Sequence, residues 1–122
     1  MFSLKNKVSV VTGASRGIGK SIAKIYAKAG AHVCCISRNK DTLDDVVESI
    51  VSNGGSASIN AFDVSKSIEF HDNINNIVKK MNVPKKLGLL SLDIDGVDYW
   101  VLKELSILDP SIIICEFPLP NP

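Results

Sequence analysis

Tyr99 and Lys103 have a spacing that suggests proton chemistry. They stand four positions apart, so in a helix both side chains lie on one face. A lysine ammonium beside a phenol favours the phenolate and lowers the pKa of a tyrosine, which suits it to proton transfer near neutral pH. The pair can act only if both side chains reach a bound substrate. From the residues alone we favour the alternative, a partly buried tyrosine beside a solvated lysine.

The segment TGASRGIG at 12–19 indicates a phosphate-binding turn. Gly13 permits a sharp turn, Gly17 lets the backbone approach a pyrophosphate, and Gly19 lets a helix pack close to a strand. An apolar run precedes the segment and a helical pattern follows it, as this motif requires. The alternative is a tight turn without a ligand. The residues expected to line a bound dinucleotide are Gly13, Ser15, Arg16, Gly17, Ile18 and Gly19.

Strand and helix patterns alternate along the chain. Strands are predicted at 7–13, 31–37, 56–64, 89–95 and 111–117, and helices at 18–30, 41–55, 68–81 and 98–105. This alternation predicts parallel strands joined by right-handed helical crossovers. The expected fold is α/β and doubly wound (Rossmann-like), a three-layer α/β/α domain with five parallel strands in the order 3-2-1-4-5. Ligands would bind between the first and fourth strands.

The composition is that of one ordinary globular domain over residues 1–122. Hydrophobic residues make up 45% and charged residues 22%, and the net charge of +1 predicts neither a nucleic-acid nor a membrane partner. No apolar run is long enough to span a bilayer and no signal-peptide pattern opens the chain, so we expect a cytoplasmic protein. The three cysteines are expected in the core, and His32 and His71 have no evident partners, so no metal site is predicted.

The segment VVTGASRGIGKSIAKIYAKAGAHVCCISRN resembles the start of a short-chain dehydrogenase/reductase, and is most similar to the β-ketoacyl carrier-protein reductases. The resemblance covers residues 5–65. It implies a nicotinamide cofactor bound over the glycine loop. It also implies that Asp63 and Val64, which match an Asp-Val pair of the family, meet the adenine. Asp63 could equally cap the next helix.

The residues where the second predicted strand ends favour NADP(H) over NAD(H). An NAD enzyme usually carries an acid there, which binds the ribose 2′-hydroxyl. This chain has Ser37 and Arg38 instead, with Arg16 in the glycine loop. Two guanidinium groups suit a 2′-phosphate.

The resemblance stops in the second half of the chain. The family's Asn-Asn-Ala-Gly motif and fifth-strand serine have no counterpart, and Tyr99 comes earlier than the family's tyrosine. A strand ending in DIDG at 93–96, a helix opening with DYW at 98–100 and an apolar strand ending in EF at 116–117 follow instead. With these motifs, residues 68–117 resemble the later strands of a Rossmann-like S-adenosylmethionine-dependent methyltransferase. The chain is therefore interpreted as a chimera, with a dinucleotide-binding half at 1–65 and a methyltransferase-like half at 66–122.

These patterns predict an NADP(H)-binding domain of the short-chain dehydrogenase/reductase type. It is expected to be truncated or chimeric and to lack the complete catalytic machinery, with Tyr99 and Lys103 as weak candidates for catalysis. If active, it would be an NADP-dependent oxidoreductase. The alternatives are a methyltransferase-like protein and an inert Rossmann-fold module. An exposed edge of the strand at 111–117 would allow a homodimer.

Overall fold

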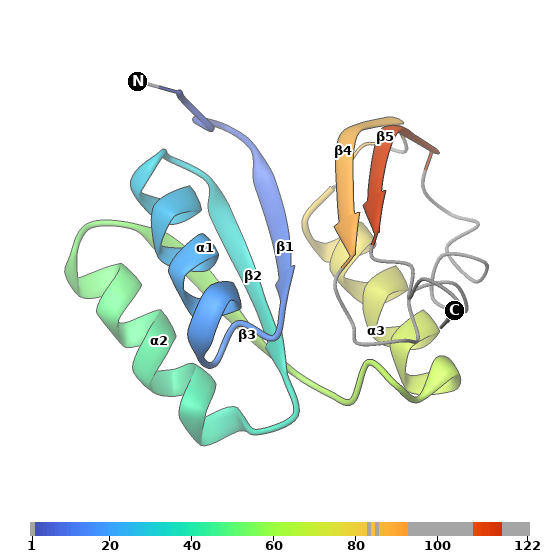
Figure 1. Ribbon diagram of the computed structural model, residues 1–122, viewed down its shortest axis with the longest axis horizontal. Helices are drawn as coiled ribbons and strands as arrows, with labels where there is room; N and C mark the ends of the chain where they lie inside the picture. Colours follow the sequence, from blue (N-terminus) through green and yellow to red (C-terminus); the bar gives the residue numbers. More distant parts are fainter. Residues whose placement is uncertain (1, 83, 85, 93–108, 116–122) are drawn as a thin grey trace, which may run out of the picture. The chain divides into compact units, whose positions relative to one another are not determined.

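The computed structural model describes residues 2–82, 84, 86–92 and 109–115, which form two compact units, Met1–Asp63 and Val64–Pro122. Figure 1 shows their helices and strands. The first unit contains β1 (Val8–Thr12), α1 (Gly17–Lys28), β2 (His32–Ser37), α2 (Lys40–Ser52) and β3 (Ser56–Ala61). The second contains α3 (Ser67–Lys80), β4 (Lys86–Leu92) and β5 (Asp109–Cys115).

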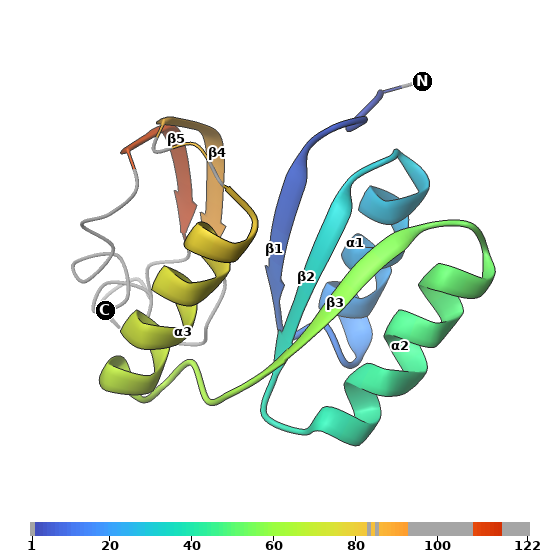
Figure 2. The ribbon, with the colours of Figure 1, turned by 180° about the vertical axis from the view of Figure 1, so that it is seen from behind.

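The three strands of the first unit form a parallel sheet in the order β1-β2-β3. Val8 pairs with His32, and His32 pairs in turn with Ser56. Both α1 and α2 lie on one face of this sheet (Figure 2). Each helix connects two neighbouring parallel strands, which is the right-handed crossover that the alternating pattern predicts.

The two helices begin one residue before their predicted starts, and they end two and three residues before their predicted ends, ahead of the glycines expected to stop them. The Asn39 side chain caps α2 by accepting a hydrogen bond from the Thr42 N–H at 3.3 Å. Gly30 follows α1 with φ +101°, and Gly54 follows α2 with φ +79°. These values lie in the left-handed region that glycine adopts without a steric cost, so both glycines act as helix stops.

The core of the first unit lies between the sheet and its two helices. It contains Val33 and Cys35 of β2 and Leu43, Val46 and Ile50 of α2, all buried. Cys34 is buried too but is not part of this cluster, because neighbouring residues of a strand point to opposite faces. The prediction that these two cysteines are core residues is confirmed.

His32 has partners that its sequence neighbours do not reveal. Its Nδ1 lies 2.6 Å from the Ser56 hydroxyl and its Nε2 lies 3.2 Å from the Ser58 hydroxyl. The expectation that His32 lacks partners is therefore wrong. These contacts depend on the register of β2 against β3, which brings together residues 24 and 26 positions apart.

The second unit contains one helix and two parallel strands. Phe70, Ile74 and Ile77 recur at helical spacing on α3 and are buried. β4 pairs with β5, with Lys86 beside Asp109 and Leu92 beside Cys115. No helix among the described residues is long and apolar enough to cross a membrane.

The predicted Rossmann-like class is confirmed, with differences in detail. Within the first unit the strands pair in the order β1-β2-β3, and within the second β4 pairs with β5. β4 begins three residues before its predicted start because backbone pairing with β5, rather than side-chain hydropathy, sets the boundary. The helix predicted at 98–105 lies outside the described residues.

We expect Leu43→Ala to lower the free energy of unfolding by about 2–5 kcal/mol, because Leu43 is fully buried and its loss leaves a cavity. Val51→Ala is the matched control on the same helix. Val51 is 53% exposed, so its effect should stay within about 0.5 kcal/mol. Urea unfolding followed by circular dichroism measures both, and equal losses would contradict this account of the core.

The Cys35 thiol should be unreactive in the folded chain. Burial raises its pKa to about 11, and the neighbouring Cys34 adds to the rise. The thiolate, which is the reactive form, is therefore scarce at pH 8. Iodoacetamide labelling of Cys35, located by peptide mass spectrometry, should be at least about tenfold slower in the native chain than in urea. Equal rates in the two states would refute the expectation.

The same pKa shift gives the sign of a pH effect on stability. Below the ordinary thiol pKa, Cys35 is neutral in both the folded and unfolded states, so it does not change the free energy of unfolding with pH. Above it, the unfolded chain releases the proton while the folded chain keeps it, up to about pH 11. This cysteine therefore lowers the free energy of unfolding as the pH rises through that window.

Candidate functional site

The glycine loop joins the end of β1 to the start of α1, and its three glycines serve different needs. Gly13 has φ +64° and Gly17 has φ +54°, so both adopt the left-handed conformation. Gly19 has an ordinary φ but no room for a side chain. A Cβ there would overlap the Gly13 carbonyl oxygen and lie 2.7 Å from the Gly13 carbonyl carbon. The first turn of α1 therefore packs directly on the backbone that follows β1.

The start of α1 presents backbone N–H groups for which the described part of the chain supplies no acceptor. The helical hydrogen bonds begin with Lys20 N–H donating to the Arg16 carbonyl at 3.2 Å, so the N–H groups of residues 17–19 precede them. Arg16 is the N-cap residue, and its side chain makes no capping hydrogen bond. The Ile18 side chain is 75% exposed, so in the first turn only its backbone has a defined role. Free N–H groups and the positive end of a helix dipole attract an anion.

The space over Gly17 is open. A Cβ built on Gly17 would meet no atom within 4 Å, in contrast to Gly19. A ligand group could therefore approach the backbone at this position. Open space beside unused N–H groups is the geometry that a phosphate needs.

A hydrogen bond holds the glycine loop against β2. Ala14 is fully buried, and its N–H donates to the Ile36 carbonyl at 3.1 Å. Ser15 is partly buried and Arg16 is exposed. The backbone of the loop is thereby fixed, while its charged side chain remains accessible.

Ser37 and Arg38 follow Ile36 directly, at the same edge of the sheet. Ser37 is partly buried, and its hydroxyl donates to the Asn39 carbonyl at 3.1 Å. Arg38 is exposed, and neither Arg38 nor Arg16 forms an ion pair within the described part of the chain. The two guanidinium groups that the sequence assigns to a 2′-phosphate are therefore not neutralised by a described carboxylate.

The end of β3 reaches the same edge. The Phe62 N–H donates to the Ser37 carbonyl at 3.0 Å, and Asp63 and Val64, which follow, are partly buried. The N-cap of α3 is Lys66, so the alternative that Asp63 caps this helix is wrong. Because carboxyl ends of parallel strands share an edge, the first unit gathers the glycine loop, the residues after β2 and Asp63.

Tyr99 and Lys103 lie outside the described residues. No group of three or more His, Cys, Asp or Glu side chains that could hold a metal occurs among the described residues.

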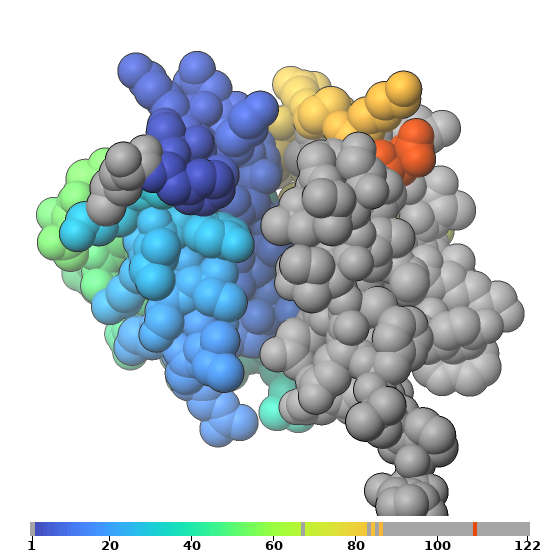
Figure 3. Space-filling model, turned by 45° about the horizontal axis from the view of Figure 1, so that its top comes forward, coloured from blue at the N-terminus to red at the C-terminus, as the bar shows by residue number. Residues whose placement is uncertain are grey.

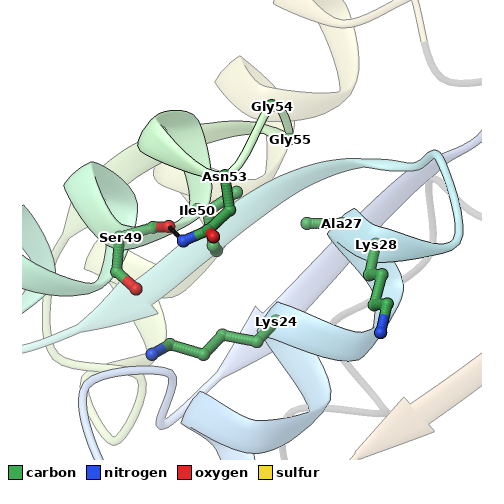
Figure 4. A pocket seen from close by; sticks show the side chains of 8 residues that line it. All are labelled: Lys24, Ala27, Lys28, Ser49, Ile50, Asn53, Gly54 and Gly55. Carbon is green, nitrogen blue, oxygen red and sulfur yellow. Dashed lines mark hydrogen bonds between the residues drawn. The ribbon is translucent and has the colours of Figure 1, made fainter.

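A cavity of about 390 Å³ lies at the other end of the two helices (Figure 4). Lys24 and Lys28 of α1 line it together with Ser49 and Asn53 of α2. In the figure Lys24 reaches toward α2, whereas Lys28 points away from it. Lysines in the last turns of a helix stabilise the negative end of its dipole, so their presence has a local structural reason. This hollow is separate from the glycine loop.

Sequence reasoning missed two residues of the site region, Asn39 and Thr42. Both belong to the cap of α2, and Thr42 donates its hydroxyl hydrogen to the Asn39 carbonyl at 3.0 Å. The signal was present, since asparagine is among the preferred N-cap residues and a helical pattern follows it.

The chain matches the short chain dehydrogenase family over residues 7–92. It is 51% identical over 57 residues to a fatty acyl-CoA reductase of Acinetobacter baylyi, an alignment that covers 47% of this chain and 19% of the relative. It is 30% identical over 120 residues to a short chain dehydrogenase of Pseudocercospora fijiensis, an alignment that covers 90% of this chain and 39% of that relative. The chain thus spans well under half the length of these relatives.

Solved structures of this family share the fold. A metagenomic short-chain oxidoreductase in complex with NADP has a TM-score of 0.66 at 32% identity, with 76% of this chain and 43% of that chain covered. A 7α-hydroxysteroid dehydrogenase complexed with NADH and 7-oxo glycochenodeoxycholic acid has a TM-score of 0.67 at 32% identity. The alignment covers 77% of this chain and 36% of that chain.

These matches do not support the interpretation of the chain as a chimera with a methyltransferase-like half. The family match continues through α3 and β4, past the expected junction near Ser65. A short apolar strand that ends in acidic residues is common to many nucleotide-binding α/β folds, so that pattern could not separate the two families. From the glycine loop through β4, the chain is a short-chain dehydrogenase/reductase-type domain and belongs to the short chain dehydrogenase family.

Proposed function

We propose that this domain binds NADP(H), with the pyrophosphate over the glycine loop. The observation that carries the proposal is the start of α1, where no described residue accepts a hydrogen bond from the N–H groups of residues 17–19 and the space over Gly17 is open. Gly13 and Ser15 would complete the lining of the loop. An anion at this point gains from free donors and from the helix dipole.

The 2′-phosphate would be bound by Arg16 and Arg38. A guanidinium group can donate two parallel hydrogen bonds to phosphate oxygens, and both side chains are exposed. An NAD-binding domain usually carries an acid at the end of β2, where this chain has Ser37. Because the solved relatives include one NADP and one NADH complex, the choice between cofactors rests on these residues of the chain itself.

Asp63 and Val64 would meet the adenine at the end of β3. A carboxylate there could accept a hydrogen bond from the exocyclic amino group. When bound, the nicotinamide ring would supply hydride transfer, and the described residues would hold and orient the cofactor. Tyr99 and Lys103, the pair spaced for proton transfer, lie outside them.

Arg38→Ala should weaken NADPH binding and leave NADH binding unchanged. Charged hydrogen bonds contribute about 1.5–3 kcal/mol, so we expect a loss of roughly ten- to a hundredfold in NADPH affinity. Lys28→Ala is the control, because it removes one exposed positive charge at the other end of α1. Isothermal titration calorimetry measures the affinities of the wild type and of both variants for NADPH and for NADH. A wild-type chain that binds NADH as tightly as NADPH would refute the cofactor assignment.

Gly17→Ala should reduce affinity for both cofactors, because its Cβ would occupy the space left for the phosphate and would strain a residue at φ +54°. Gly54→Ala is the matched control. Gly54 also has a positive φ and no atom within 4 Å of a built Cβ, but it follows α2, away from the loop. Both variants should lose about 1–2 kcal/mol of stability, and only Gly17→Ala should lose binding. Equal binding by both variants would refute the role of the loop.

A further inference from the structure

The backbone on the far side of Arg38 is held by the side chain of Thr42. The Thr42 hydroxyl donates to the Asn39 carbonyl at 3.0 Å, and the same carbonyl accepts the Ser37 hydroxyl at 3.1 Å. The Asn39 side chain accepts the Thr42 N–H at 3.3 Å. Arg38 therefore stands between two residues, Ser37 and Asn39, that are joined to each other and to the first turn of α2.

The near side of Arg38 is fixed as well. The Ile36 carbonyl accepts the Ala14 N–H of the glycine loop, and the Ser37 carbonyl accepts the Phe62 N–H after β3. These two links are made by backbone atoms, so no substitution other than proline removes them. The Thr42 hydroxyl is the link from α2 that a substitution can delete while leaving the helix cap from Asn39 in place.

We propose that Thr42 is a positioning residue that sets the preference for a 2′-phosphorylated nucleotide. By holding the Asn39 carbonyl, it limits the conformations of the backbone that carries Arg38, so that less backbone entropy is lost when the guanidinium binds a ligand. This inference rests on the proposed function, because it assumes that Arg38 binds the 2′-phosphate. Thr42 itself touches no ligand.

Thr42 contributes little to the packing of the first unit. Its side chain is exposed, and it is not among the core residues of the first unit. Within α2 the Asp44 carboxylate is paired with Lys40 at 3.0 Å, whereas the Thr42 hydroxyl is bound to a backbone carbonyl. A purely structural role would change the stability of the domain and would weaken all adenine nucleotides by the same factor.

The test uses the full chain and two probes that differ only in the 2′-phosphate, adenosine 2′,5′-bisphosphate and 5′-AMP. Calorimetry gives the affinity for adenosine 2′,5′-bisphosphate divided by the affinity for 5′-AMP, and we call this quotient the ratio. It is measured for wild type, Thr42→Val, Thr42→Ser and Arg38→Ala. Valine keeps the shape of threonine without the hydroxyl, whereas serine keeps the hydroxyl. We expect Thr42→Val to lower the ratio by about three- to tenfold and Thr42→Ser to restore it.

Arg38→Ala should lower the ratio further, and adding Thr42→Val to it should have no additional effect, because the two residues act through one guanidinium. Urea unfolding checks that Thr42→Val is folded. If Thr42→Val does not fold, the comparison of Thr42→Ser with wild type still tests the role of the hydroxyl. An unchanged ratio in Thr42→Val, with Arg38→Ala lowering it, overturns the inference and leaves the proposed function intact. A wild-type ratio of one overturns both.

Discussion

The close approach of α1 to the end of β1 is the constraint from which the site follows. Gly19 has backbone atoms of Gly13 where any other residue would have its Cβ. This contact fixes where the helix begins, and so fixes the position of its unused N–H groups relative to the sheet edge. Figure 3 shows α1 at the surface of the first unit, consistent with the exposed side chains of Ile18 and Ile25 along it. The inner side of the helix buries Ala23 and Ala27, whose small side chains suit a close approach to the sheet.

The parallel sheet turns this local contact into a site with several components. Neighbouring parallel strands end at one edge, so segments far apart in the sequence arrive together there. Two backbone hydrogen bonds from the end of β2 hold this arrangement: Ile36 binds the glycine loop, and Ser37 binds the start of the segment after β3. The charged side chains at this edge remain exposed while their backbones are fixed. Specificity can thus change by substitution at the surface without disturbing the core beneath it.

The sequence was most informative where a residue type has one physical use. Positive φ at Gly13 and Gly17, the crowded Gly19 and the apolar faces of the helices follow from local rules, and the structure agrees with them. Features that depend on strand register were not predictable, as the two serine partners of His32 show. The start of β4 at Lys86 was missed for the same reason. The methyltransferase-like interpretation failed because it relied on a strand-end pattern that several nucleotide-binding folds share.

The described side-chain hydrogen bonds around Arg38 fall within a short contiguous run, from Ser37 to Thr42. Because these hydrogen bonds join residues of the run to one another, the run can keep its conformation wherever a parallel strand leads into a capped helix. The segment could therefore be exchanged as a unit between relatives, while the strand pairing before it and the buried face of the helix after it stay unchanged. Natural divergence in coenzyme use could follow the same route, through a few exposed positions in one βα turn rather than through coordinated change across the fold.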